Sequence, residues 1–165
     1  MLEDLDKELA LAFAYMSKSS AINKLHAAKF QRDGRALHAK LLMSIARSEA
    51  IQARRTLMYV RGKLKDAFGY FDELLAHKNQ DADQKYPQLS DRLQEEGMIK
   101  ASEAFEQFSK VARVQRNLLN DLLENSADQA TDYYVCDICG YVAVDDPPDN
   151  CPACNAVKEK FSKQT

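Results

Sequence analysis

Four cysteines near the end of the chain are the residues best suited to chemistry. Cys136 and Cys139 form one Cys-x-x-Cys pair, Cys151 and Cys154 form a second, and eleven residues separate the pairs. Each such turn brings two thiolates to one side of an ion, and two turns that face each other complete a tetrahedral shell of sulfur. The spacing therefore predicts one metal ion held by these four cysteines.

The residues that follow each pair fit this interpretation. Gly140 is expected to supply the positive φ that the first turn requires, and Asn155 tolerates the same conformation after the second.

Two disulfide bonds are the alternative use of four cysteines. The first six residues are acidic where a secretory signal would be basic. We therefore expect a reducing cytoplasm, where a metal site is favoured over disulfides.

A long helical region precedes the cysteines. Apolar residues recur at helical spacing, which predicts helices over residues 2–32, 35–64, 66–96 and 98–125. Asp33-Gly34 should end the first helix, and Pro87 should kink or break the third. Four long helices predict a four-helix bundle over residues 1–126. After a polar linker at 125–130, residues 131–165 are expected to form a separate small β and metal-binding module.

Composition excludes several classes of protein. The chain has 165 residues, of which 45% are hydrophobic and 29% charged, and it lacks an apolar run of membrane-spanning length. The net charge is −2 and no basic stripe is present, so nucleic acid is not an expected partner. Residues 131–165 hold three lysines against six acidic residues. This acidity suggests a partner protein with a basic face, or a surface charge that simply keeps the module soluble.

The residues around the cysteines carry a family resemblance. The runs 134–141 and 147–154, with Phe161 beyond them, resemble the shortened rubredoxin module at the C-terminus of rubrerythrins. The resemblance implies one iron per chain at the four cysteines, with Tyr134, Tyr141 and Phe161 packed around it. Zinc remains the alternative, because the same four sulfurs suit both metals. The resemblance continues through the helices, so it implies a ferritin-like four-helix bundle.

In that family the bundle also holds a di-iron centre. Carried over by position, its ligands fall on Met16, Glu49, Gln52, Lys78, Asp81, Ala112 and Gln115. Glu49 and Asp81 are the only carboxylates among them, and Lys78 adds a positive charge where an anion is needed. Two iron ions require several carboxylates and imidazoles. We therefore expect no di-iron centre, and we expect Lys78 to pair with Glu49, Asp81 or both.

Three functions fit these observations. The first is a rubrerythrin-like non-haem iron redox protein that transfers electrons at the four-cysteine site, linked to peroxide defence through the resemblance alone. No catalytic residue is assigned, and His26, His38 and His77 are expected on the surface or in packing. The second is a structural protein with a zinc ribbon and no redox role. The third is a di-iron peroxidase with unconventional ligands.

The connection between the second and third helices bears on assembly. The ferritin-like arrangement runs these helices parallel, so the connection must return along the bundle. A helix of ~29 residues is ~44 Å long, whereas the six residues 61–66 reach ~20 Å. The chain can adopt an up-down-up-down bundle instead, or helices 1 and 2 can pack with helices 3 and 4 of a second chain. We expect this domain-swapped homodimer.

Overall fold

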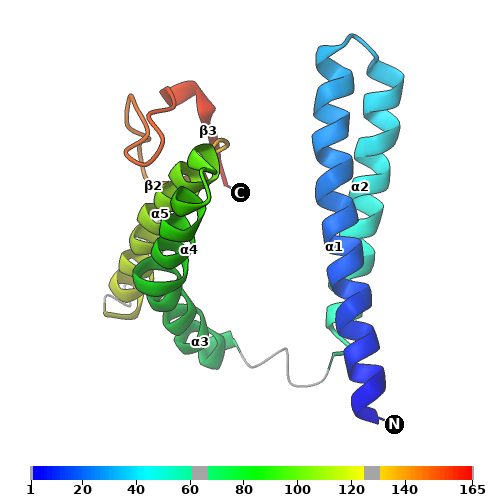
Figure 1. The fold of residues 1–165 in the computed structure, drawn as a ribbon, viewed down its shortest axis with the longest axis horizontal. Coiled ribbons are helices and arrows are strands. Elements are labelled where there is room, and N and C mark those ends of the chain that lie inside the picture. The colour runs from blue at the N-terminus through cyan, green and yellow to red at the C-terminus, as the bar shows by residue number, and fades with distance from the viewer. Residues whose placement is uncertain (1, 61–66, 125–130, 165) are drawn as a thin grey trace. The chain divides into compact units, whose positions relative to one another are not determined.

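The computed structural model describes residues 2–60, 67–124 and 131–164 (Figure 1). Contacts divide the chain into two compact units, Met1–Asp66 and Ala67–Thr165. Helices dominate both units, and a three-stranded sheet lies near the C-terminus. The predicted fold class, mostly α followed by a small β module, is confirmed. Among the described helices, none is both long enough and apolar enough to cross a membrane.

The first unit is a hairpin of two helices. Helix α1 spans Leu2–Arg32 and α2 spans Ala36–Leu57. Gly34 between them has φ +73°, and the N–H of Arg35 donates to the carbonyl of Phe30 at 2.8 Å. This is the hydrogen bond of a Schellman C-cap, so the predicted end of the first helix is confirmed. Helix α2 ends earlier than the predicted residue 64, and residues 61–64 lie outside the described part.

Small residues line the contact between α1 and α2. Ala27, Ala39, Ala46 and Ala53 are all buried there, and the Ser20 hydroxyl donates to the carbonyl of Ala46 at 2.7 Å. Small side chains let the two backbones approach closely enough for this bond. The large apolar side chains of the hairpin lie elsewhere, and many are exposed within this unit: Leu5, Leu11, Tyr15, Ile22, Leu25, Leu37, Leu41, Ile45 and Met58.

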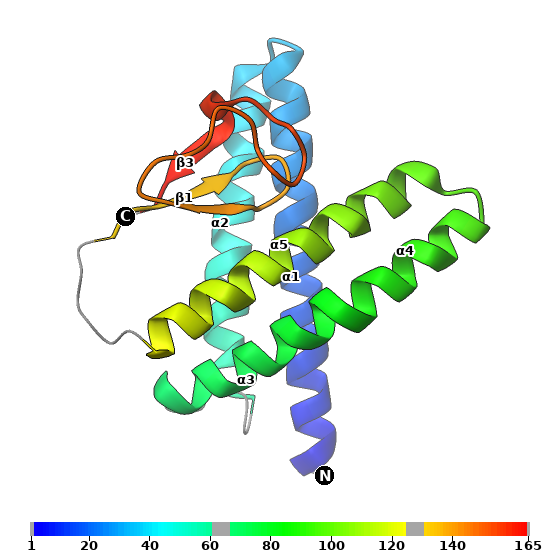
Figure 2. The same ribbon diagram turned by 90° about the vertical axis from the view of Figure 1, so that its left-hand side faces the viewer.

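The second unit begins with a helical pair. Helix α3 (Ala67–Gln80), the π-helical turn η1 (Asp81–Lys85) and α4 (Tyr86–Glu95) follow one another alongside α5 (Ile99–Glu124), as Figure 2 shows for the labelled helices. Gly97, with φ +73°, ends α4 as predicted. The third and fourth predicted helices are thus present, and the third is interrupted.

The interruption lies directly before Pro87. Proline has no N–H to donate and its ring crowds the preceding turn, so a regular helix cannot pass through this position unchanged. The N–H of Tyr86 bonds instead to the carbonyl of Asp81, five residues back. The carbonyl of Ala82 accepts a hydrogen bond from the Ser109 hydroxyl of α5 at 2.7 Å. The expected kink is therefore a π-turn that a serine of the neighbouring helix stabilises.

A small antiparallel sheet completes the second unit. Its strands are β1 (Tyr133–Cys136), β2 (Val142–Val144) and β3 (Phe161–Lys163), in the order β2-β1-β3. Cys136 pairs with Phe161 across β1 and β3. A short 3₁₀ helix, η2 (Lys158–Lys160), leads into β3. The linker predicted at 125–130, which sets the boundary between the two predicted domains, lies outside the described residues.

Candidate metal centre

Two equivalent turns carry the four cysteines. Cys136 ends β1, and Cys139 lies in the turn that leads toward β2. Cys151 and Cys154 occupy a second turn before η2. Because Cys136 is held in the central strand of the sheet, the position of the first turn is fixed by strand pairing on both sides.

The backbone of the two turns repeats the same bonds. The N–H of Gly140 donates to the carbonyl of Cys136 at 2.9 Å, and that of Asn155 donates to Cys151 at 2.8 Å. The N–H of each of these cysteines bonds to the carbonyl five residues on, at 2.9 and 2.7 Å. Gly140 has φ +80° and Asn155 has φ +60°. Both predicted left-handed positions are confirmed, and each directly follows the second cysteine of its pair.

The four sulfur atoms converge on one point. They all lie within 4.8 Å of one another. The Cys136 and Cys154 sulfurs are 3.7 Å apart, and those of Cys139 and Cys151 are 3.6 Å apart. These separations exceed a disulfide bond, and all four cysteines are free. A tetrahedral metal–sulfur site with bonds of ~2.3 Å has sulfurs about 3.8 Å apart. The four free sulfurs therefore lie close enough together to hold one four-coordinate ion.

Burial and backbone hydrogen bonds have opposite effects on the pKa values of the cysteine thiols. Burial acts to raise the pKa of the Cys136 thiol, but hydrogen bonds from the N–H groups of Cys139 and Ile138 and from neighbouring thiols outweigh it, so this pKa is lowered. Burial raises the pKa of the Cys139 and Cys154 thiols, although each sulfur also accepts a backbone hydrogen bond. Four clustered thiolates, three of them on buried cysteines, need a cation to balance their charge, and binding a metal deprotonates the thiols.

Apolar groups surround the sulfurs. Cys136 is only 1% exposed, and the buried cluster around the site includes Ala153 and Val111, with Tyr141 and Phe161 packed against it. The rings of Tyr141 and Phe161 meet edge to face, 6.4 Å between centroids. Two of the three predicted aromatic neighbours are confirmed. Tyr134 is half-buried and lies outside this cluster.

Val111 was missed as a neighbour of the site. It belongs to α5, and the sequence assigned it to the apolar stripe of the bundle. In the structure it packs against the cysteine cluster, so α5 supplies part of the wall of the metal centre. A helical apolar period identifies a buried face but not what covers it. The sequence therefore carried no signal that could distinguish these two roles.

Acidic groups dominate the surface of the module, and two of its lysines are paired. Lys158 donates to Asp146 and Lys163 to Asp132, each at 2.7 Å. These hydrogen bonds raise the pKa of both lysines. Asp145 has φ +59°, a left-handed position that the sequence analysis did not anticipate. Since six acidic residues face three lysines in residues 131–165, these pairs leave the module with an acidic excess.

The positions carried over from the di-iron centre are divided between the two units. Glu49 of α2 accepts hydrogen bonds from Ser19 at 2.7 Å and from Asn23 at 2.9 Å, both on α1. In the second unit, Asp81 forms an ion pair with Lys85 at 3.8 Å. Ala112 is buried there, and Lys78 and Gln115 line an apolar pocket. The expected pairing of Lys78 with Glu49 joins two units, so it stays a prediction.

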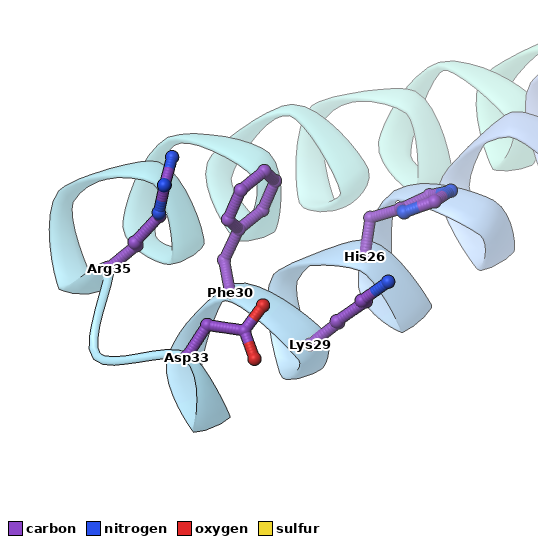
Figure 3. A pocket seen from close by; sticks show the side chains of 5 residues that line it. All are labelled: His26, Lys29, Phe30, Asp33 and Arg35. Atoms are coloured by element: carbon purple, nitrogen blue, oxygen red, sulfur yellow. The ribbon is translucent and has the colours of Figure 1, made fainter.

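The histidines lie where the sequence analysis expected them. His26 is exposed at a shallow pocket of about 430 Å³ beside the turn between α1 and α2, together with Lys29, Phe30, Asp33 and Arg35 (Figure 3). His38 stacks on Phe30, with ring centroids 5.2 Å apart. His77 is also exposed. These are surface and packing positions.

Known proteins resemble the C-terminal module in sequence and most of the chain in structure. Residues 134–162 match the rubredoxin-like domain of rubrerythrin. The structure of nigerythrin in its mixed-valence state is 19% identical, with a TM-score of 0.56, and the match covers 96% of this chain and 86% of that one. Fully reduced, all-ferrous nigerythrin is 20% identical, with a TM-score of 0.57 and the same coverage. A search of curated protein sequences finds no match.

These likenesses cover both parts of the predicted resemblance. The match to the rubrerythrin domain contains all four cysteines, and the likeness to nigerythrin extends over the helices as well. The chain therefore has a nigerythrin-like fold whose C-terminal module is similar to the rubredoxin-like domain of rubrerythrins, as its cysteine motif predicted.

Proposed function

We propose that the four cysteines bind one iron ion and that the protein transfers single electrons through it. The observation that carries the proposal is the convergence of four sulfurs, 3.6–3.7 Å apart in cross-pairs, within an apolar shell. Zinc would suit the same geometry. Iron is favoured because the module matches a rubredoxin-like domain, and because the nigerythrin structures are described as mixed-valence and all-ferrous.

The chain would support electron transfer by holding the four sulfurs rigidly and by shielding the metal from water. A bound iron supplies a one-electron change of charge while keeping its four thiolate ligands. The paired backbone bonds that close each turn hold the sulfurs in place, so little movement accompanies that change. N–H groups directed at the sulfurs stabilise their negative charge and tune the reduction potential. Tyr141 and Phe161 pack against the buried cysteine cluster, where they would limit the access of water to the metal.

The redox partner is proposed to be a protein with a basic face. The acidic excess of the module supports this, because two of its three lysines are already paired with Asp146 and Asp132. Complementary charge mainly speeds association, so electron transfer should slow as salt is added. We further propose a reducing, cytoplasmic location for the thiolate site.

We propose that the protein takes part in peroxide defence by passing electrons to such a partner protein, and not by a reaction with peroxide within its own helices. Of the carried-over ligand positions, Glu49 and Asp81 alone are carboxylates, and each already has partners of its own. The seven carried-over ligand positions together carry a formal charge of −1, since Lys78 offsets one of the two carboxylates. This supports the loss of the di-iron centre, which needs far more negative charge.

A spectroscopic redox titration tests the proposal. The purified protein should absorb visible light through thiolate-to-iron charge transfer, and reductant should bleach this band reversibly with a one-electron slope. Hydrogen peroxide added to the reduced protein alone should give no catalytic turnover. A colourless protein that contains zinc would overturn the redox proposal and favour a structural ribbon. Rapid peroxide turnover without a partner would overturn the proposed loss of the di-iron centre.

A further inference from the structure

One side chain from outside the cysteine module lines the metal centre. Val111 of α5 is 6% exposed, and it belongs to the same buried cluster as Cys136, Cys139 and Cys151. The remaining buried member of this cluster is Ala153, whose side chain is a single methyl group. Val111 is therefore the bulkiest buried side chain of the cluster that is not a ligand, and a helix supplies it.

The module has few buried side chains of its own with which to cover the ion. Apart from the cysteines, the buried residues in its described part are Ala143, Pro147 and Ala153. Tyr141 and Phe161 pack against the cysteine cluster but stay partly exposed. Because so small a domain buries only a modest share of its surface, cover from another element has a large effect on the site.

Two buried serines hold α5 against the other helices of the second unit. Ser102 and Ser109 are seven residues apart, about two helical turns, so both lie on one face of α5. The Ser90 hydroxyl of α4 donates to the carbonyl of Ser102 at 3.0 Å. The Ser109 hydroxyl donates to the carbonyl of Ala82 in η1 at 2.7 Å. Val111 comes two residues after Ser109, about 200° around the helix, so the nearly opposite face of α5 packs against the cysteines.

We propose that Val111 shields the metal of the four-cysteine site, so that α5 is a working part of the metal centre. An apolar side chain packed against three ligand residues leaves less room for water to reach the metal–sulfur bonds. Water and chelators attack these bonds when a metal is lost. The shield should therefore slow the loss of any ion that the four sulfurs hold.

The same shield should lower the reduction potential of a bound iron. Four thiolates with ferric iron carry one negative charge in total, and with ferrous iron they carry two. Excluding water disfavours the more highly charged form, so an apolar wall favours the ferric form. This part of the inference rests on the proposed electron transfer, whereas the slow loss of the metal does not.

Metal transfer to a coloured chelator tests the shield in the full, metal-loaded chain. Val111→Ala should speed the transfer about tenfold, because the loss of two methyl groups opens a path to the sulfurs. Val114→Ala is the matched control, since Val114 lies half-buried on the same helix but outside the cysteine cluster. Its transfer rate should stay near that of wild type. Equal acceleration in both variants would overturn the proposal, because α5 would then act through the general stability of the helices.

A redox titration of the iron-loaded variants gives the second test. The potential of Val111→Ala should be more positive than those of wild type and Val114→Ala, a change that lost folding stability alone does not produce. A potential equal to that of wild type, or more negative, would overturn the shielding role. If the natural metal is zinc, the redox proposal fails, while transfer from the zinc-loaded chain still tests Val111. A wild-type transfer rate in Val111→Ala would overturn the shield and leave the electron-transfer proposal intact.

Discussion

The four-cysteine module and the α1–α2 hairpin bury similar kinds of residue with different consequences. In the module, Cys136, Cys139, Cys151 and Ala153 form one buried cluster with Val111 of α5, and Cys154, Tyr141 and Phe161 pack against it. A metal ion bound by the sulfurs would lie within this small core. In the hairpin, alanines and Ser20 form the buried contact between the two helices, and large side chains such as Leu11 and Leu25 stay exposed in that unit. A small core can be completed by a metal or by another protein surface.

The two regions therefore differ in how much of their structure is encoded locally. In the module, each cysteine pair, its following glycine or asparagine and the backbone bonds of the turn lie within six residues. The hairpin has a local Schellman turn at Gly34, but many of its large apolar side chains stay exposed within that unit. A region that depends on a bound metal and one that depends on packing should respond differently to substitution.

Loss of a metal ligand should have the largest effect. Cys139→Ser or Cys151→Ser should abolish metal binding and unfold residues 131–164, because metal binding supplies most of the folding free energy of so small a module. The helical signal in circular dichroism should remain. Ile138→Ser is the matched control, since Ile138 is 60% exposed in the same turn and offers only its backbone to the site. Full metal content in either cysteine variant would disprove the ligand assignment.

Loss of a buried hydrogen bond between helices should have an intermediate effect. Ser109→Ala removes the donor to the Ala82 carbonyl at the π-turn, and should cost about 1–2 kcal/mol in the free energy of unfolding. Metal content should not change. Ser44→Ala removes an exposed bond within α2 and should cost less than about 0.5 kcal/mol in denaturant titration. Equal costs for the two serines would show that the π-turn does not need its partner on α5.

The surface ion pairs should have the smallest effect, and one that depends on pH. The pKa of Lys158 is raised by its hydrogen bond with Asp146. The pair therefore contributes stability in full below the unfolded lysine pKa of 10.5 and loses it as the pH rises through the folded value. Lys158→Met should lower the melting temperature of the module slightly at neutral pH and low salt. The difference from wild type should shrink at high salt and above pH 10.5, and a difference that grows there would contradict this sign.

Sequence reasoning succeeded where a residue type has one structural meaning. Gly34, Gly97, Gly140 and Asn155 all adopt the positive φ expected from their types and positions. It failed where the outcome depends on distant contacts. The end of α2 at Leu57 and the placement of Val111 against the cysteines are not identified by helical periodicity. The interruption expected at Pro87 is present, but its form as a π-turn was not predicted. Asp145 at φ +59° shows that a tight turn can use a residue other than glycine.

Elemental analysis of the purified protein, read together with its visible spectrum, tests the central claim most directly. The proposed function predicts one iron per chain at the four clustered sulfurs, with thiolate-to-iron absorption, and no further iron at the carried-over positions, where carboxylates are scarce. The Ile138→Ser protein should give the same value, and Cys139→Ser should give none. One zinc per chain without colour would contradict the redox account, and three irons per chain would contradict the loss of the di-iron centre.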